Sequence, residues 1–261
     1  MSSAVPSREL EGRRILVVGA SSGIGRHLGL LAASHGATVA FAARRASLVQ
    51  EAALEAGQHS IGLVLDVRDP ASCEQAVAEV VESFGGLDDI VYSTAVDRLV
   101  RLADADADVW RDTYETNVIG AALVCRAALP HLAASRGRAV FISASSVGRP
   151  LPGMSVYASS KAALEEMVRG WRGEHPDLAF ATVRVGSALG TGVTDQWDRE
   201  LLVELSSTWQ QLGYVHDNGP GAPMTAEQAA EVVLLTLTSP VWLREVTVVS
   251  DPGRHTPHRP N

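Results

Sequence analysis

The chain contains few of the residues that build cross-linked or membrane-spanning proteins. Only two of its 261 residues are cysteines, Cys73 and Cys125, which is too few for a disulfide framework or a cysteine-based metal site. No apolar stretch approaches the roughly 20 residues that a membrane helix requires. The N-terminus lacks the apolar core of a signal peptide. We therefore expect a soluble, cytoplasmic protein with no metal centre and no membrane partner.

Positive charge is also in deficit. The sequence has 22 Lys and Arg residues against 30 Asp and Glu residues, which gives a net charge of −8. This balance argues against nucleic acid as a partner. Hydrophobic residues make up 46% of the chain, enough for one large core. We find no repeat and no linker, so we expect a single domain over residues 1–250 and a loose tail at 251–261.

Short apolar runs alternate with helical patterns along most of the sequence. This alternation predicts an α/β fold, in which a doubly wound parallel sheet of about seven strands carries helices on both faces. Ligands of such sheets bind beyond the carboxyl ends of the strands. We predict strands at 14–18, 38–43, 61–65, 89–92, 138–143, 179–185 and 245–249, and helices at 23–35, 47–56, 70–84, 106–133, 154–172, 195–212 and 225–238.

A glycine-rich turn follows the first predicted strand. It reads Gly19-Ala20-Ser21-Ser22-Gly23-Ile24-Gly25 and leads directly into a helical pattern. Glycines allow the tight turn and a close approach of the backbone, and the helix N-terminus offers free N–H groups to a diphosphate. Strand, glycine turn and helix together predict a dinucleotide site. Its expected contacts are Gly19, Ser21, Ser22, Gly23, Ile24 and Gly25.

The segment Tyr157-Ala-Ser-Ser-Lys161 places a phenol and an ammonium four residues apart. On a helix this spacing brings both side chains to one face. A nearby positive charge favours the ionised form of an acid, so we expect Lys161 to lower the pKa of Tyr157. A phenol of this kind exchanges a proton with a carbonyl oxygen or an alcohol near neutral pH.

The glycine turn and the Tyr157–Lys161 pair together resemble the short-chain dehydrogenase/reductase family, whose motifs are G-x-x-x-G-x-G and Y-x-x-x-K. The resemblance runs from about Leu10 to Val249 and implies a Rossmann-type fold. It implies that Asn117 is the catalytic asparagine, holding a water that links Lys161 to solvent. It also implies that Asp66, Val67, Thr94, Ala95 and Gly186 contact the cofactor together with Tyr157 and Lys161.

The end of the second predicted strand, Ala43-Arg44-Arg45, bears on the choice of cofactor. NAD-dependent relatives place an acid at the position of Ala43. An uncharged residue there removes the repulsion of a 2′-phosphate, and a guanidinium holds phosphate through paired hydrogen bonds. We therefore predict NADP(H) in preference to NAD(H), held by Arg44 or Arg45, with the other arginine solvated.

Three positions depart from the family pattern. Relatives carry a serine thirteen residues before the tyrosine, where this chain has Ala144. A bulge or an early turn after Ile142 would bring Ser145 into the pocket. We therefore favour Ser145 as the substrate contact, and Ser143 as the second candidate. A site that works without any serine is a further alternative. In the other two departures, Ala95 replaces a glycine beside the nicotinamide ribose, and Val185 replaces the proline before Gly186.

Two classes of function fit these residues. The first is an NADPH-dependent ketoreductase that acts on a small carbonyl or alcohol substrate, with Tyr157 as general acid or base. The second is a weakly active or non-catalytic NADP(H)-binding scaffold or sensor, and an isomerase or dehydratase on the same residues is a further alternative. We expect a substrate lid at about 191–223, where Trp197 and Trp209 suit an aromatic or polyketide-like substrate. The family resemblance implies a homo-oligomer, a tetramer or a dimer, joined through the helices 106–133 and 154–172.

Overall fold

The computed structural model describes residues 10–57, 59–192, 194–195, 197–214 and 223–249. At its centre lies a seven-stranded parallel sheet with the strand order β3-β2-β1-β4-β5-β6-β9. The predicted α/β fold class is confirmed, and every predicted strand agrees with the observed one to within a residue. The strands are β1 (Arg14–Val18), β2 (Thr38–Ala43), β3 (Ile61–Val64), β4 (Asp89–Tyr92), β5 (Arg138–Ala144), β6 (Ala179–Val185) and β9 (Glu245–Val248).

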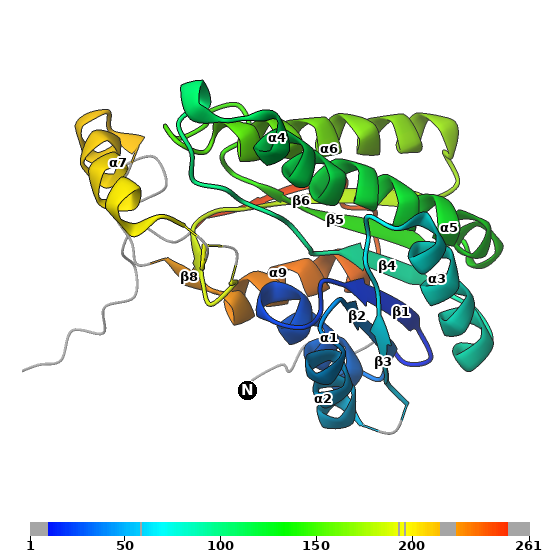
Figure 1. Ribbon diagram of the computed structural model, residues 1–261. Helices are drawn as coiled ribbons and strands as arrows, with labels where there is room; N and C mark the ends of the chain where they lie inside the picture. The colour runs from blue at the N-terminus through cyan, green and yellow to red at the C-terminus, as the bar shows by residue number, and fades with distance from the viewer. Residues whose placement is uncertain (1–9, 58, 193, 196, 215–222, 250–261) are drawn as a thin grey trace, which may run out of the picture.

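Helices cover both faces of the sheet, as Figure 1 shows. Helices α1, α2 and α9 cover one face, where Leu28, Val49 and Val233 join a core with alternate residues of the strands. Helices α3, α5 and α6 cover the other face, where Val77 and Val124 contribute to a second core. The helices are α1 (Gly23–Ser34), α2 (Ala46–Ala56), α3 (Pro70–Phe84), α4 (Ala107–Tyr114), α5 (Gly120–Ser135), α6 (Ser155–Glu174), α7 (Arg199–Gln211) and α9 (Ala226–Thr238).

The long helix predicted at 106–133 is divided in the structure. A π-helical turn at Glu115–Ile119 separates α4 from α5. Such turns widen the helix, leave carbonyl groups without their usual partner, and often occur at functional sites. Here the hydroxyl of Tyr92, which is fully buried, donates a 2.5 Å hydrogen bond to the carbonyl oxygen of Thr116. Tyr92 therefore belongs to the core and supports the turn that carries Asn117.

The expectation that no run is apolar enough to cross a membrane is wrong for 107–135. These 29 residues have a mean hydropathy of 1.5 over the best window, so length and composition alone would allow a membrane helix. In the fold, the inner side of the α5 part packs against the sheet through Val124, Ala128 and Leu132. Length and composition alone do not distinguish a membrane span from a helix that packs on a sheet.

The predicted helix at 195–212 starts later than expected. It begins at Arg199 because the Asp198 side chain accepts a 2.9 Å hydrogen bond from the Leu201 amide and caps the helix. In Figure 1, α7 lies apart from the helices that cover the sheet, near β8. Three short elements were not predicted: a 3₁₀ helix (Leu102–Asp104) and the parallel pair β7 (Ala188–Leu189) and β8 (Met224–Thr225).

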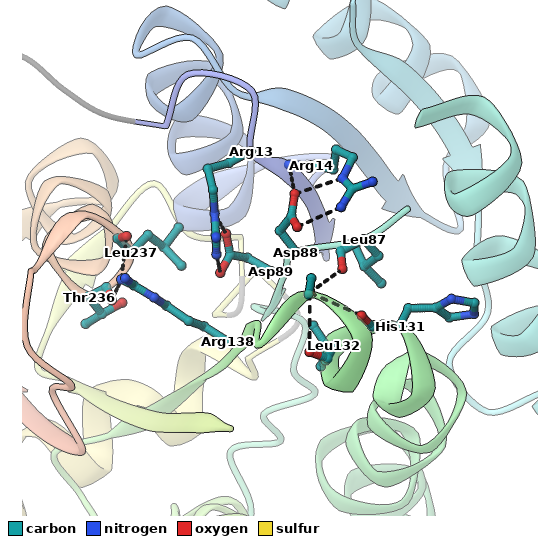
Figure 2. Close-up of polar contacts among 11 residues, drawn as sticks. Arg13, Arg14, Leu87, Asp88, Asp89, His131, Leu132, Arg138, Thr236 and Leu237 are labelled. Atoms are coloured by element: carbon teal, nitrogen blue, oxygen red, sulfur yellow. Dashed lines mark hydrogen bonds and ion pairs between the residues drawn. The ribbon is translucent and has the colours of Figure 1, made fainter. Parts of the chain in front are cut away.

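Ion pairs hold the amino ends of β1 and β4 together, as Figure 2 shows. The Arg13 guanidinium donates hydrogen bonds of 2.9 and 2.6 Å to the Asp89 carboxylate. The Arg14 guanidinium donates two of 2.8 Å to the Asp88 carboxylate. Arg138 of β5 donates to the carbonyl oxygens of Thr236 and Leu237 at the end of α9. This cluster lies at the opposite edge of the sheet from the predicted site, so its role is to fix the strands.

Candidate active site

The predicted site residues meet at the carboxyl edge of the parallel sheet. Strand register brings Val18 beside Tyr92, and Tyr92 beside Phe141, while Ala144 lies beside Val185. The residues that follow these strand ends therefore share one edge. They are Gly19 after β1, Thr94 and Ala95 after β4, Ser145 after β5 and Gly186 after β6.

The glycine turn needs glycine for reasons of space and of backbone conformation. Gly19 has φ +88°, and a Cβ added there would lie 2.6 Å from the amide nitrogen of Thr94. A Cβ on Gly25 would lie 2.5 Å from the carbonyl oxygen of Gly19. Gly23 has φ +58° and faces the backbone of Thr191. The turn is thus packed between the end of β4 and the segment that follows β7, and only glycine allows this approach.

Arg45 lies over the glycine turn. Its guanidinium donates hydrogen bonds of 2.8 Å to both the Ser21 and the Ser22 hydroxyl oxygens. Ser22 is the N-cap residue of α1, yet its side chain makes no capping hydrogen bond. A cation, two hydroxyls and a helix N-terminus therefore gather at the end of β2. These groups suit an anionic ligand such as a nucleotide phosphate.

Asp66 follows β3 and is held by Arg68. Its carboxylate accepts hydrogen bonds from the Arg68 backbone at 3.0 Å and from the side chain at 3.2 and 3.3 Å. These hydrogen bonds lower the pKa of Asp66, and the charge of the exposed Arg44 contributes in the same direction. Val67 is buried against Gly120 at the start of α5. Asp66 is thus held by Arg68, and Val67 packs against the start of α5.

Tyr157 and Lys161 lie one turn apart on α6, and Lys161 is almost fully buried. The Lys161 Nζ donates a 2.8 Å hydrogen bond to the carbonyl oxygen of Ile142 in β5. It lies 5.7 Å from the centroid of the Tyr157 ring. The structure therefore brings the two residues together at the carboxyl edge and fixes the lysine on the sheet.

The electrostatics around Tyr157 differ from the prediction. Burial raises the pKa of the Tyr157 phenol above its ordinary value, and the carboxylate of Asp97 raises it further. Burial lowers the pKa of Lys161 to about 8, whereas the carboxylates of Asp97 and Glu165 act in the opposite direction. The expected lowering of the tyrosine pKa by Lys161 is thus wrong for the protein groups taken alone, because desolvation and the carboxylate of Asp97 both raise this pKa. Tyr157 holds its proton at neutral pH.

The Asn117 side chain is fully buried and bonded to protein. Its Oδ1 accepts from the Val96 amide at 2.7 Å, and its Nδ2 donates to the Val96 carbonyl oxygen and to the Ser160 hydroxyl, both at 2.9 Å. Both amide hydrogens are therefore used within the protein. Asn117 therefore fastens the segment after β4 to α6.

The serines around Ala144 have different surroundings. β5 continues to Ala144, so the strand shows no early turn after Ile142. The Ser143 hydroxyl donates a 2.7 Å hydrogen bond to the buried Glu165, which commits it to the protein core. Ser145 lies half-buried in the turn after the strand, and the Ser146 Oγ is buried without a hydrogen-bond partner among the described residues. Of the two predicted serines, only Ser145 stays available.

Sequence reasoning missed Asp97. This residue is 4% exposed, and its Oδ1 is buried without a hydrogen-bond partner in the described part of the chain. Its charge acts on both Tyr157 and Lys161. Burial raises the pKa of Asp97 to about 7, while Lys161 acts to lower it. The one available indication in the sequence was an acid in the segment that follows β4.

Helix α7 closes one side of the edge. The Trp209 indole donates a 2.9 Å hydrogen bond to the carbonyl oxygen of Pro152, five residues before Tyr157. Leu205 is buried and lies directly against Gly153. The rings of Trp197 and Trp209 pack edge to face, with 6.5 Å between their centroids. The predicted lid therefore packs on the turn before α6. Its residues 193, 196 and 215–222, like the tail at 251–261, lie outside the described residues.

The chain belongs to the short-chain dehydrogenase family, whose model matches residues 13–200. It is 35% identical over 186 residues to an 11-beta-hydroxysteroid dehydrogenase A of Sesamum indicum, an alignment covering 69% of this chain and 53% of the relative. It is 36% identical over 168 residues to an 11-beta-hydroxysteroid dehydrogenase 1A of Arabidopsis thaliana, covering 62% and 48%. The chain spans about half the length of these curated relatives.

Two solved structures share the fold over nearly the whole chain. One is a short chain dehydrogenase from Burkholderia cenocepacia in complex with NADP, with a TM-score of 0.79 and 27% identity, covering 94% of this chain and 99% of that one. The other is an alcohol dehydrogenase from the archaeon Thermococcus sibiricus complexed with 5-hydroxy-NADP, with a TM-score of 0.76, 24% identity and the same coverage. The second likeness bears on the fold alone.

Proposed function

We propose that the protein is an NADPH-dependent ketoreductase that acts on a small carbonyl or alcohol substrate. The observation that carries this proposal is the Tyr157–Lys161 pair at the carboxyl edge of the sheet, with Lys161 hydrogen-bonded to Ile142. A reduced nicotinamide, when bound, supplies a hydride to the carbonyl carbon. Tyr157, which is protonated at neutral pH, gives its proton to the carbonyl oxygen.

The remaining chain residues have supporting roles in this proposal. Lys161 holds the nicotinamide ribose, Asn117 orients the segment around Val96, and Ser145 contacts the substrate oxygen. The glycine turn, from Gly19 to Gly25, takes the diphosphate. Asp66 and Val67 contact the adenine, while Thr94, Ala95 and Gly186 line the nicotinamide side.

NADP(H) is the cofactor that we propose over NAD(H). The support is the position of Arg45 over the Ser21 and Ser22 hydroxyls, together with the uncharged Ala43 at the end of β2. A 2′-phosphate there would exchange its hydration for a guanidinium and two hydroxyls. Arg44, which acts on Asp66, would face the adenine side instead.

The proposed substrate is an aromatic or polycyclic ketone. Two observations support this class. The Trp197–Trp209 pair provides flat apolar surface next to the turn that precedes Tyr157, and the curated relatives carry hydroxysteroid dehydrogenase names. We further propose a cytoplasmic homo-oligomer, a tetramer or a dimer, joined through α5 and α6. The exposed Ile119, between α4 and α5, is available for such a contact.

The substitution Tyr157→Phe tests the function. It should lower ketone-dependent NADPH oxidation by about 100-fold or more, because it removes the proton donor, and leave nucleotide affinity nearly unchanged. Tyr114→Phe is the matched control, since the Tyr114 hydroxyl bonds Ser159 on the same helix without touching the pair. Full activity of Tyr157→Phe would refute the role of the tyrosine. A wild-type protein that binds NADPH but reduces no ketone of a broad panel would support the scaffold alternative.

A further inference from the structure

The substrate oxygen in this site lacks the usual serine beside the tyrosine. Position 144 is a buried alanine without a polar group, and the Ser143 hydroxyl is committed to Glu165. A ketone oxygen that becomes an alkoxide needs hydrogen-bond donors around it, and one such donor is typically worth a hundredfold or more in rate. Ser145, half-buried after β5, is the one serine that we propose as a contact of this oxygen, so the site has room for a further donor next to Tyr157.

Asp97 lies in a segment that is attached to the protein on both sides. Residue 96 is clamped from both sides by the Asn117 amide, which bonds the Val96 amide at 2.7 Å and the Val96 carbonyl at 2.9 Å. Four residues further on, the Val100 amide bonds the carbonyl oxygen of Gly153 at 2.9 Å. These two attachments stretch the segment between the π-helical turn and the turn that precedes Tyr157. Asp97 is thereby fixed between these two attachments, where its charge acts on Tyr157 and Lys161.

The carboxyl group of Asp97 has an unused hydrogen-bonding position. The residue is only 4% exposed, and its buried Oδ1 has no hydrogen-bond partner among the described residues. A buried polar group without a partner costs free energy, so its retention calls for an explanation. On the described elements, the ionisable groups whose charges interact with Asp97 are Tyr157 and Lys161, both on α6, and Glu165 acts in turn on Lys161.

We propose that Asp97, in its protonated form, is a further catalytic residue that donates a hydrogen bond to the substrate oxygen beside Tyr157. This inference rests on the proposed reductase function. The carboxyl keeps its proton throughout: Tyr157 loses the proton that the new alcohol gains, and the Asp97 O–H only donates. A carboxylic acid kept neutral by its surroundings acts as such a donor elsewhere. Once ionised, Asp97 would repel the charge that develops on the oxygen.

The proposal predicts a particular pH dependence. Because burial raises the pKa of Asp97 to about 7, the donor is present below that pH and disappears above it. The kcat for ketone reduction by the wild type should therefore fall as the pH rises through about 7. Asp97→Asn retains a donor that does not titrate. Its kcat should therefore stay within about tenfold of wild type and should not fall as the pH rises through about 7. Asp97→Ala should be about 100-fold slower than wild type below pH 7, and the difference should shrink at higher pH, where the wild type loses the same donor.

The experiment measures kcat and KM between pH 5.5 and 9 for wild type, Asp97→Asn and Asp97→Ala, with Asp104→Asn as an exposed carboxylate control. NADPH affinity and circular dichroism check that each variant is folded. The proposal is overturned if Asp97→Ala keeps the wild-type kcat, if Asp97→Asn is as slow as Asp97→Ala, or if the limb near pH 7 persists in Asp97→Asn. If Asp97→Ala does not fold, the pH profile of kcat for Asp97→Asn decides whether the proposal stands.

Tyr157→Phe is measured in parallel so that the two proposals can fail separately. An inactive Tyr157→Phe together with a fully active Asp97→Ala rejects the role of Asp97 and leaves the reductase function in place. An active Tyr157→Phe rejects the proposed function itself, whatever the Asp97 variants do.

Discussion

The Ser143 hydroxyl donates a 2.7 Å hydrogen bond to Oε1 of Glu165. The same carboxylate accepts hydrogen bonds of 2.7 and 2.5 Å from Arg184 of β6. Glu165 lies on α6, one turn beyond Lys161, and is 3% exposed. This network ties the helix of the catalytic pair to the ends of two strands. Ser143 therefore has a structural role, although its position beside Ala144 makes it look like a catalytic residue in the sequence.

Ser143→Ala should lower stability and leave catalysis in place. The substitution removes one donor from a buried carboxylate, which costs about 1–3 kcal/mol in the free energy of unfolding. The kcat should stay within about threefold of wild type, since the hydroxyl faces Glu165. Urea unfolding and steady-state kinetics measure the two quantities. Ser145→Ala is the matched control and should change stability by less than about 0.5 kcal/mol. Equal stability losses in both variants would contradict the network.

Arg45→Ala should weaken the use of NADPH far more than the use of NADH. Arg45 donates to both serines of the glycine turn, where we propose that the 2′-phosphate binds. A charge-assisted hydrogen bond contributes about 1.5–3 kcal/mol, so kcat/KM for NADPH should fall roughly 10- to 100-fold. The value for NADH should change only a few-fold. Arg44→Ala is the control and should affect both nucleotides alike. A uniform loss for both nucleotides in Arg45→Ala would reject the assignment.

Asp88→Asn should make the protein less sensitive to acid. Burial acts to raise the pKa of Asp88, but hydrogen bonds from the Arg14 side chain and backbone lower it below its ordinary 3.8. A carboxyl with a lowered folded-state pKa stabilises the fold above its ordinary pKa, and this stability is lost as the pH falls through the folded value. The variant should therefore lose about 1–3 kcal/mol at neutral pH and show a shallower decline below pH 4. Urea unfolding between pH 7 and 3 measures both effects.

A surface ion pair provides the control for that experiment. Arg126 and Glu74 are bonded at 2.8 Å, but their side chains are 57% and 62% exposed. Exposed pairs contribute little, so Glu74→Gln should change the free energy of unfolding by less than about 1 kcal/mol and leave the acid limb as in wild type. If Asp88→Asn behaves like Glu74→Gln, the ion pairs at the amino edge of the sheet do not stabilise the fold as described.

The local pattern of the sequence was sufficient for the strands, for most of the helices and for the two motifs. Apolar runs such as Arg14–Val18 are almost fully buried, and a short continuous apolar run is typical of a strand in a parallel sheet covered on both faces. Gly19 and Gly25 have local reasons for their identity: Gly19 adopts a φ of +88°, and a Cβ on Gly25 would lie 2.5 Å from the carbonyl oxygen of Gly19. The four-residue spacing of Tyr157 and Lys161 follows from the period of a helix. Each of these features depends on neighbours close in the chain, so sequence alone determined them.

Contacts between distant segments decided the rest. The π-helical turn is supported by Tyr92, which reaches the carbonyl oxygen of Thr116 from strand β4. The burial of Asp97 depends on a clamp from Asn117 and on a turn more than fifty residues away. Desolvation then reverses the expected direction of the Tyr157 pKa. Burial and charge at a site come from the packing of several elements, and no local pattern encodes them. The sequence therefore located the edge of the sheet where we propose the chemistry, and only the tertiary structure revealed the electrostatics of that edge.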